Sequence, residues 1–490
     1  MTITAMPKGR LLEQLLPNEL VVGGRFLATA TGGEVEHVNP ATGRSQRVIP
    51  MAGAAEVDEA VAAARAALTG WRMLPPSERR RLLSRFADLI RANLDDLSAT
   101  AALEIGSPVT QMPFLVQWAA DWIEDAAGWA DKLYGSTSPL SDRGVFEYTA
   151  IEPCGVVAVV ATWNGSIGGF GMSAAAPLAA GCTIVVKCSE MAPFGILRAA
   201  SLALEAGIPP GVVNVITGGP EASQGLVSHP GIDKVTFTGS PETARHVAAA
   251  CAQRLTPCVF ELGGKSAVLV FDDASLDRAV ADAMQVTGRA GQICTLGSRL
   301  VVQVGVYDEF VGRLAEAARA VKQGMPFDAG VSMGPVINRA AFDRILALIE
   351  RARGYGDVVT GGAPAGGELA DGFFLQPTVI ATPDNTGEIA RSEVFGPVLT
   401  VIPFHDEDDA VSIANDSDYG LAAYLHTADV SRVHRVAAQL DVGSVGVNAG
   451  AVPAGAHLPF GGRKQSGYGK QGGLAGVAEF VNTKTVQLRL

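Results

Sequence analysis

The chain has 490 residues, of which 48% are hydrophobic and 18% are charged, and its formal net charge is −12 at pH 7. This length predicts two or three domains, and the composition is that of a well-buried protein, which excludes a disordered chain. The negative charge argues against nucleic acid or an anionic membrane as the main partner, because both bind basic surfaces. A small-molecule partner is therefore expected.

The sequence also limits where the protein works. Residues 1–20 contain no long apolar core and no small-residue cleavage site, so we expect a cytoplasmic protein. Apolar stretches such as residues 156–161 are far shorter than the ~20 residues that cross a bilayer, which predicts no membrane span. The histidines lack ligand spacing, so no metal site is predicted. We expect reduced thiols rather than disulfides, because no paired spacing links Cys154, Cys182, Cys188, Cys251, Cys258 and Cys294.

Two amphipathic helices are expected near the N-terminus, over residues 55–68 and over residues 77 to about 97. In the second, apolar residues such as Leu82, Phe86 and Ile90 recur at helical spacing after a Pro-Pro pair. The apolar face of each helix indicates that both cover a sheet.

From Gly155 onward, short β-rich runs alternate with stretches long enough for a helix. This alternation is typical of parallel βα units, and ligands bind at the carboxyl ends of such strands. Two series, with a boundary near residues 257–264, predict an α/β fold with two Rossmann-like parallel-sheet domains. The expected strands cover residues 156–162, 183–187, 212–216 and 234–238 in the first series, and residues 267–271, 299–304, 398–404, 421–427 and 444–448 in the second.

Two segments fit neither series, namely residues 134–148 and the tail from 467 to 490. Residues 484–490 alternate like an edge strand. We interpret both segments as strand arms that pack on a neighbouring subunit.

One cysteine has surroundings unlike the other five. Cys294 lies in Gly-Gln-Ile-Cys-Thr-Leu-Gly-Ser-Arg, where glycines make it accessible and the charge of Arg299 favours the thiolate, which is the nucleophilic form. Glu261 ends an apolar run beside Gly263 and Gly264, which let a substrate or cofactor approach the backbone closely. The pair indicates covalent catalysis with a separate base, in a cleft between the two domains.

A literal Gly-x-Gly-x-x-Gly occurs at residues 467–472. We reject it as a dinucleotide fingerprint, because that motif needs a preceding strand, a following helix and an acidic residue ~20 positions later. Better candidates follow two strands of the first series. Lys187 and Glu190 offer a cation and a carboxylate to ribose hydroxyls, and Ser240 precedes a helix whose N–H groups can hold a phosphate. Taken singly, each is equally a solvated loop residue or a helix cap.

Two further loops carry candidate groups. Asn164 closes the first strand of the first series, where its amide can donate to a developing oxyanion or simply form a turn. Glu393 and Phe395 stand before a Gly-Pro turn, where they can contact a ligand or form a polar loop with an aromatic plug.

The motifs together resemble the aldehyde dehydrogenase superfamily, in its NAD(P)-dependent, non-acylating members, from about Val21 to Val486. Seven motifs in one order carry the resemblance: Trp163-Asn164, Lys187-x-Ser189-Glu190, Phe237-Thr238-Gly239-Ser240, Glu261-Leu262-Gly263-Gly264-Lys265, Gly291-Gln292-x-Cys294, Glu393-Val394-Phe395-Gly396-Pro397 and Pro459-Phe460-Gly461-Gly462.

The resemblance implies a division of the chain into three parts. Residues 1–130 and 151–258 form the NAD-binding domain, and residues 259–463 form the catalytic domain. Residues 131–150 and 464–490 form an oligomerisation arm, in a homodimer or homotetramer.

The resemblance also implies residue roles. Cys294 attacks the aldehyde carbon, the Asn164 amide and the Cys294 N–H hold the oxyanion, and Glu261 activates the water that hydrolyses the thioester. The cofactor is NAD, with NADP possible, since the Glu190 carboxylate repels a 2′-phosphate. The implied cofactor contacts are Thr162, Trp163, Lys187, Ser189, Glu190, Gly239, Ser240, Leu262, Glu393 and Phe395, and the implied substrate pocket is Gly168, Met172, Leu296 and Phe460.

Several residues depart from the family pattern, and they bear on the substrate. Glycines from 165 to 171 are expected to widen the tunnel, whose other side chains are apolar, so a medium or large uncharged aldehyde is predicted. A coenzyme A-acylating semialdehyde dehydrogenase and a non-catalytic nucleotide-binding relative remain as alternatives. The departures are Thr162, Gly165, Ser166, Ser173 and Cys188.

Overall fold

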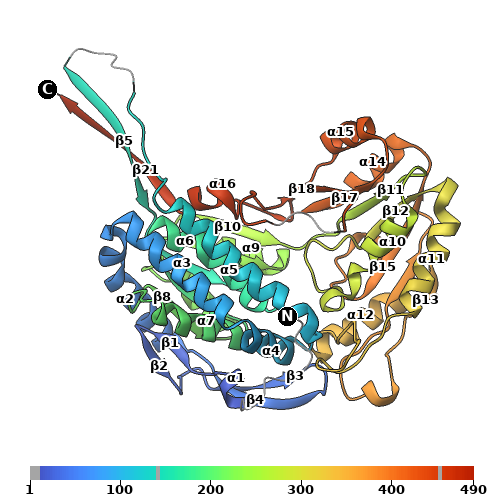
Figure 1. Cartoon of the computed structure of the whole chain (residues 1–490), viewed down its shortest axis with the longest axis horizontal. Helices are drawn as coiled ribbons and strands as arrows, with labels where there is room; N and C mark the ends of the chain where they lie inside the picture. Colours follow the sequence, from blue (N-terminus) through green and yellow to red (C-terminus); the bar gives the residue numbers. More distant parts are fainter. Residues whose placement is uncertain (1–11, 139–143, 451–454, 490) are drawn as a thin grey trace.

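The computed structural model describes residues 12–138, 144–450 and 455–489. Two large sheets occupy two lobes that lie side by side, and a long two-stranded arm projects from the outer side of the first lobe (Figure 1). Both large sheets are mainly parallel, which confirms the predicted α/β class.

The first sheet has eight strands in the order β2-β1-β8-β7-β6-β9-β10-β20. The five central strands are parallel, and β1, β2 and β20 join its edges in antiparallel pairs. Every residue of β6, β7 and β8 is buried, as expected for parallel strands that are covered on both faces. The strands are β1 Leu20–Val22, β2 Arg25–Leu27, β6 Val156–Val160, β7 Thr183–Cys188, β8 Val213–Thr217, β9 Lys234–Gly239, β10 Cys258–Leu262 and β20 Gly467–Tyr468.

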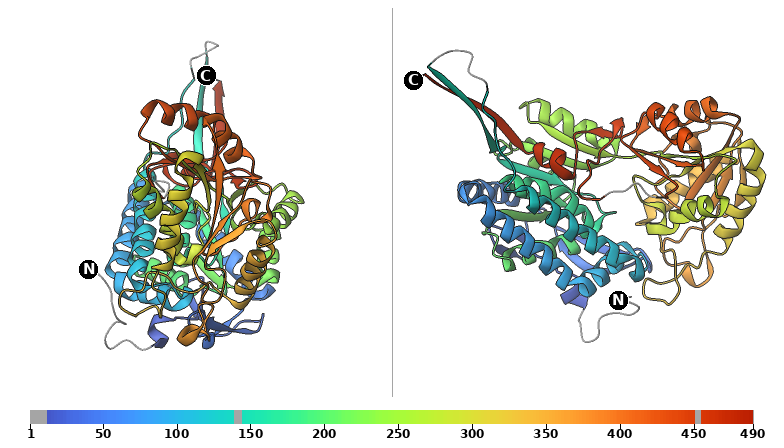
Figure 2. Two further views of the ribbon diagram at one scale, coloured as in Figure 1. Left: turned by 90° about the vertical axis from the view of Figure 1, so that its right-hand side faces the viewer. Right: turned by 45° about the horizontal axis from the view of Figure 1, so that its top comes forward.

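Helices cover both faces of this sheet. Val157 and Val159 of β6 pack with α6 and α7, and the alternate residues Val156 and Val160 pack with α2, α8 and α9. Helices α3 and α5 form a further layer outside α6 and α7 (Figure 2). The helices are α2 Ala54–Met73, α3 Pro76–Ala92, α4 Leu94–Ile105, α5 Met112–Trp129, α6 Ser166–Ala180, α7 Phe194–Glu205, α8 Pro220–Ser228 and α9 Pro241–Ala252.

The helix predicted from 77 to about 97 is two helices. Helix α3 ends at Ala92 and α4 begins at Leu94, because Asn93 leaves the helical conformation with ψ of 21°. The Asn93 amide donates to the Leu89 carbonyl at 2.8 Å, which caps the first helix. Helix α2 covers the sheet as predicted, whereas α3 packs on α5 and α7.

The second sheet has seven strands in the order β13-β14-β15-β12-β11-β17-β18, and only β13 is antiparallel to its neighbour. Every strand of both predicted series is present. The strands are β11 Ala267–Val270, β12 Arg299–Gln303, β13 Asp357–Thr360, β14 Thr378–Ala381, β15 Val398–Phe404, β17 Ala422–His426 and β18 Ser444–Val447. The helices of this lobe are α10 Leu276–Ala283, α11 Tyr307–Arg319, α12 Arg339–Ala352, α13 Glu388–Arg391, α14 Glu407–Asn415 and α15 Val430–Gln439.

The passage between the lobes differs from the division predicted at residue 259. Strand β10 pairs with β9 in the first sheet, so the chain leaves that sheet only after Leu262. It returns at β20, where Gly467 pairs with Glu261. A Cβ on Gly467, whose φ is +108°, would lie 2.1 Å from the Phe260 carbonyl oxygen, so this close return needs glycine. Part of the predicted arm, from 464 onward, thus belongs to the first lobe.

The arm consists of β5 Val145–Pro153 and β21 Val481–Arg489. They pair antiparallel along their whole length, from Val145 with Arg489 to Pro153 with Val481. Both lie in or beside the two segments that were predicted as strand arms. Figures 1 and 2 show this ribbon extending away from both lobes.

Shorter elements complete the described chain. Helix α16 packs on α5 and α6 at the root of the arm. The short elements are α1 Leu12–Leu15, β3 Glu34–Asn39, β4 Arg44–Pro50, β16 Tyr419–Gly420, β19 Arg463–Lys464, α16 Gly473–Ala478 and the 3-10 helices η1 Val109–Gln111, η2 Met284–Gly291, η3 Val304–Val306 and η4 Gly367–Leu369. Within the described ranges, no helix combines the length and apolarity that crossing a bilayer requires. All six cysteines are free.

Candidate active site

Cys294 lies on the loop between η2 and β12, and the backbone of this loop is strained. Arg289 and Ala290 have φ of +46° and +49°, and Gly291 follows at +75°. A Cβ on Gly291 would lie 2.1 Å from the Gly396 carbonyl oxygen. Left-handed residues other than glycine persist only where the surroundings hold them, and they cluster at functional sites.

The side chain of Gln292 holds this loop in place. It is buried, donates to the Arg289 carbonyl at 2.8 Å and accepts from the Ile337 N–H at 2.9 Å. The Gln292 amide, two residues before the thiol, therefore anchors the loop to the second lobe. The sequence alone assigned no role to this amide.

The Cys294 thiol is half-buried. Burial and the nearby carboxylates of Glu261 and Glu393 raise its pKa, and the Arg289 guanidinium acts in the opposite direction. The expectation that Arg299 favours the thiolate is wrong. The Arg299 guanidinium donates instead to Asn385 and to carbonyls after and within α14, at 2.8–3.3 Å.

Glu261 lies in β10 with only 3% of its surface exposed. Among the described residues, neither carboxylate oxygen has a hydrogen-bond partner. Burial raises its pKa well above the ordinary value, the charge of Lys470 and the Cys294 thiol lower it, and Glu393 raises it. A carboxyl group held in this way is suited to accept a proton near neutral pH.

Asn164 is tied to the cysteine loop. It follows β6, and its side-chain amide donates to the Gln292 carbonyl at 3.0 Å. A primary amide has two N–H donors, so one holds the loop and the other remains for a ligand. Asn164 thus contacts the cysteine loop, and the charge of Glu261 acts on the Cys294 thiol.

Glu393 occupies the space that two glycines leave open. It accepts from the Gly264 N–H at 3.0 Å, and a Cβ on Gly263 would lie 2.1 Å from its carboxylate. The close approach that these glycines permit is therefore made, in this structure, by Glu393. Burial raises the Glu393 pKa to about 7, against the Gly264 N–H and the charge of Lys265. Lys265 is itself buried, with a pKa lowered to about 7 by burial and Arg299.

Aromatic rings lie next to this carboxylate. Phe395, whose φ is +51°, packs edge-on against Trp163 with ring centroids 5.5 Å apart. Phe395 and Leu296 both line a cavity of ≈ 10 Å³. The two predicted loops, after β6 and before β15, are therefore in contact.

The remaining predicted cofactor residues gather at one edge of the first sheet. Strands β7, β6 and β9 are neighbours, so the residues at their carboxyl ends lie along that edge. Lys187 is buried, and burial lowers its pKa while the charge of Glu190 raises it. The Ser240 hydroxyl caps α9 by accepting from the Thr243 N–H at 3.2 Å. The residues at this edge are Thr162, Trp163, Lys187, Ser189, Glu190, Gly239, Ser240 and Leu262.

One predicted substrate residue has a different role. A Cβ on Gly168 would lie 3.1 Å from both the Leu115 carbonyl oxygen and the Trp118 ring, so this glycine allows α6 to pack closely on α5. Gly169 instead faces open space. Met172 is half-buried, and Leu296 and Phe460 are buried in the apolar core. Space is therefore left open at Gly169 but not at Gly168, and the widened tunnel stays a prediction.

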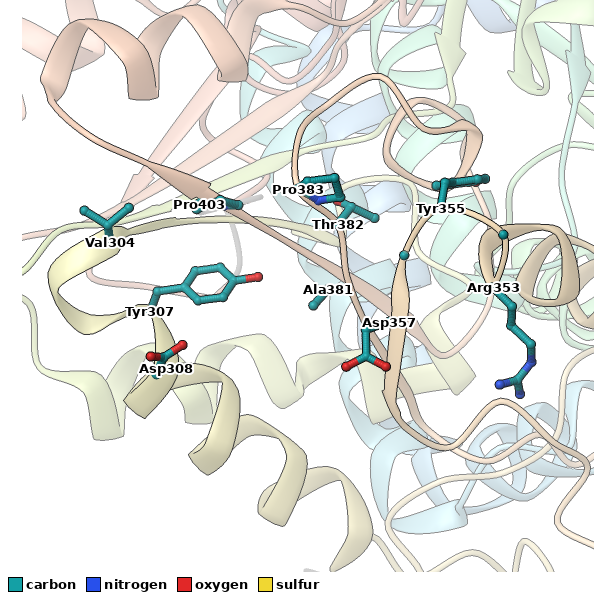
Figure 3. Close-up of a pocket in the computed structure, with 12 residues that line it drawn as sticks. Val304, Tyr307, Asp308, Arg353, Tyr355, Asp357, Ala381, Thr382, Pro383 and Pro403 are labelled. Atoms are coloured by element: carbon teal, nitrogen blue, oxygen red, sulfur yellow. The ribbon is translucent and has the colours of Figure 1, made fainter.

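A larger hollow lies elsewhere. It measures ≈ 660 Å³ at the carboxyl ends of β12, β14 and β15, and Tyr307, Tyr355 and Pro403 line it. Figure 3 shows Tyr307 pointing toward Ala381 across this hollow. Every residue predicted for catalysis, cofactor or substrate is described by the structure, and none lines it.

Sequence reasoning missed the contribution of Lys470. It lies in the rejected glycine motif, next to β20, and its charge acts on Glu261 from across the sheet edge. The adjoining Ser466 donates to the Gly263 carbonyl at 2.7 Å. Only the pairing of β20 with β10 reveals these contacts. In the ranges that the structure describes, no cluster of histidine, cysteine and acidic residues is arranged to hold a metal ion.

Comparisons with known proteins agree with the motifs. The model of the aldehyde dehydrogenase family matches residues 26–486. A betaine aldehyde dehydrogenase of Cereibacter sphaeroides is 40% identical over 469 residues, which cover 95% of this chain and 96% of that protein. The crystal structure of a betaine aldehyde dehydrogenase from Staphylococcus aureus in complex with NAD+ has a TM-score of 0.95 at 31% identity, covering 98% of this chain and 96% of that chain. An NADP-dependent enzyme of E. coli has a TM-score of 0.93 at 36% identity, covering 98% and 99%.

Proposed function

This chain belongs to the aldehyde dehydrogenase family, and from that premise we propose that it oxidises an aldehyde to the free carboxylic acid with NAD, through a covalent intermediate on Cys294. One observation carries this proposal. A half-buried thiol lies beside a buried carboxyl group whose oxygens have no hydrogen-bond partner among the described residues.

Proton transfer begins at the resting thiol. Because burial and two carboxylates raise the Cys294 pKa, a base must remove the proton as sulfur attacks the aldehyde carbon. Glu261 is the group whose raised pKa suits this task. The product of attack is a thiohemiacetal.

The negative oxygen that forms in this attack needs donors. The second N–H of Asn164 and the backbone N–H of Cys294 supply them, and the bond from Asn164 to the Gln292 carbonyl holds the amide near the loop. A preorganised donor of this type contributes roughly 3 kcal/mol to the stability of a transition state.

The residues at the edge of the first sheet fit NAD. The buried side chain of Lys187 and the Glu190 carboxylate, whose charge acts on it, match a ribose, which presents hydroxyl donors and acceptors. When bound, NAD accepts the hydride and leaves an acyl group on Cys294. Glu261 then releases the thiol proton to solvent and, as a carboxylate again, activates the water that hydrolyses this thioester to the carboxylic acid and the free thiol.

The choice of NAD over NADP rests on Glu190, whose carboxylate repels a 2′-phosphate. We expect Glu190→Gln to raise kcat/KM for NADP while kcat with NAD changes little. Wild-type enzyme that prefers NADP in the same assay would contradict the assignment.

For the substrate, apolar surroundings favour a medium or large uncharged aldehyde. Met172, Leu296 and Phe460 are apolar, and Gly169 leaves space. A panel of aldehydes followed by NADH absorbance tests this choice, and it should include the betaine aldehyde and glutarate semialdehyde that relatives are named for. Strong preference for either charged compound would refute it. Product formation that requires coenzyme A would support an acylating enzyme instead.

The arm supports a homodimer or homotetramer. A two-stranded ribbon is marginally stable alone in water, and Phe146 and Leu488 expose 40% and 43% of their surface along it. A chain ending after Phe480 is expected to be monomeric by light scattering.

The free cysteines support a cytoplasmic location. We also propose the division into domains, with the boundary between the NAD-binding and catalytic domains placed after Leu262.

A further inference from the structure

A buried carboxylate lies close to the active site without taking part in the proposed chemistry. Glu104 is near the end of α4 and is completely buried. It accepts from the Phe194 N–H at 2.9 Å and from the Gly195 N–H at 3.3 Å, which begin α7. It also accepts from the hydroxyl of Ser166. The positive end of α7 and three donors thus surround one carboxylate.

Ser166 begins α6 in a conformation that serine rarely adopts. Its φ is +44°, and its side chain is completely buried. Its N–H donates to the Trp163 carbonyl at 3.2 Å, which closes the turn that contains Asn164. Such a backbone persists only where surrounding contacts hold it. A Cβ on Gly195 would lie 2.9 Å from the Ser166 hydroxyl, so α7 closely confines this side chain.

We propose that Glu104 is a positioning residue, which holds the turn of Asn164 through Ser166 and thereby aims the Asn164 amide at the oxyanion. The inference rests on the role given to Asn164 under the proposed function. Asn164 has two supports, namely its bond to the Gln292 carbonyl and this turn. The first fixes one N–H, and the second fixes the plane in which the other N–H lies.

A carboxylate suits this position better than an amide. All three neighbours donate hydrogen bonds, and an ionised carboxylate accepts from all of them. A glutamine would turn its own N–H₂ toward one of these donors.

The test is a double-mutant cycle with Asn164. We expect Ser166→Ala to lower kcat roughly 10- to 100-fold, because small misplacements of catalytic groups have effects of that order, with the dissociation constant for NAD unchanged. In an Asn164→Ala background, Ser166→Ala should lower kcat no further, since it acts through Asn164. Glu104→Gln should repeat this pattern.

Ser98→Ala is the matched control. Ser98 is a buried serine of α4, the helix that carries Glu104, and its hydroxyl has no hydrogen-bond partner among the residues described. The kcat of the Ser98→Ala variant should equal that of the wild type. The melting temperature of each variant shows whether it folds.

Three results would overturn the inference. They are wild-type kcat in Ser166→Ala, losses that multiply in the double variant, and a parallel loss of kcat, NAD affinity and melting temperature. The last two would indicate a structural role alone. Wild-type activity in Asn164→Ala would refute the role of Asn164 itself, and the inference with it, so the two failures are distinguishable.

Discussion

The active site and the arm use the same charged residue types in opposite ways. At the active site, Glu261 and Lys265 are 3% and 1% exposed, and among the described residues their charged atoms have no hydrogen-bond partners. On the arm, Lys484 pairs with Glu152 at 2.6 Å, and the two side chains are 56% and 34% exposed. Burial without a partner shifts a pKa and makes a group reactive, whereas water screens an exposed pair. Substitutions in the two regions should therefore differ greatly in effect.

The largest effect is expected at the nucleophile. Cys294→Ala should lower kcat by at least about 10³-fold, because it removes the atom that forms the covalent intermediate, while NAD binding persists. Steady-state NADH formation and cofactor titration measure both. Cys258→Ala is the control, since Cys258 is also a half-buried free cysteine but lies in β10 of the first lobe. Equal activity in the two variants would refute the assignment.

Replacement of the base should come next. Glu261→Gln is expected to lower kcat roughly 10²- to 10⁴-fold, because both the attack by sulfur and the hydrolysis of the thioester lose their base, and rapid mixing followed by NADH absorbance should show a slowed first turnover. Glu388→Gln, which alters an exposed partner of Arg351, should keep wild-type kcat. Full activity of Glu261→Gln would require another base.

The same variant tests the effect of burial on stability. The folded-state pKa of Glu261 lies above its ordinary value, so the protonated form stabilises the folded state. That stability is fully present below the unfolded pKa and is lost as pH rises through the folded pKa. As pH rises, the free energy of unfolding in urea should therefore fall less for Glu261→Gln than for the wild type. An identical pH dependence would contradict the raised pKa.

A smaller effect is expected from the cation near the base. The charge of Lys470 lowers the Glu261 pKa, so Lys470→Met should raise that pKa and move the acidic limb of the kcat profile to higher pH. Below this limb kcat should fall a few-fold, and the alkaline plateau should persist. Lys470→Arg keeps the charge and should keep the wild-type profile. A shift to lower pH in Lys470→Met would contradict this account.

The smallest effect is expected on the arm. Lys484→Ala removes an exposed ion pair with Glu152 and should change neither kcat nor the melting temperature measurably. A clear loss of stability would mean that a neighbouring subunit buries this pair. Calorimetry at low and high protein concentration separates these outcomes.

The sequence predicted the strands well and offered candidates for the reacting residues, because both depend on local information. Apolar runs of alternating βα length fixed the two series, and the residue types at their ends named Cys294, Glu261 and Asn164. It failed where a role depends on distant neighbours. Arg299 is close to Cys294 in sequence, yet its guanidinium binds carbonyls near α14.

The glycines between residues 165 and 171 are a second case in which a role depends on distant neighbours. The sequence shows that the residues from 165 to 171 are unusually small, but not what fills the space beside each one. In the structure α5 occupies the space at Gly168, and open space remains at Gly169.

By itself, then, the sequence determined the α/β class, the order of the strands along the chain and the chemical groups available for catalysis. Tertiary structure alone decided that β10 belongs to the first sheet, that β20 brings Lys470 to Glu261, and that Glu104 supports Ser166. The physical reason is that periodicity and side-chain chemistry are properties of short segments. Burial, Coulomb interactions and hydrogen bonds between distant segments exist only after the chain has folded.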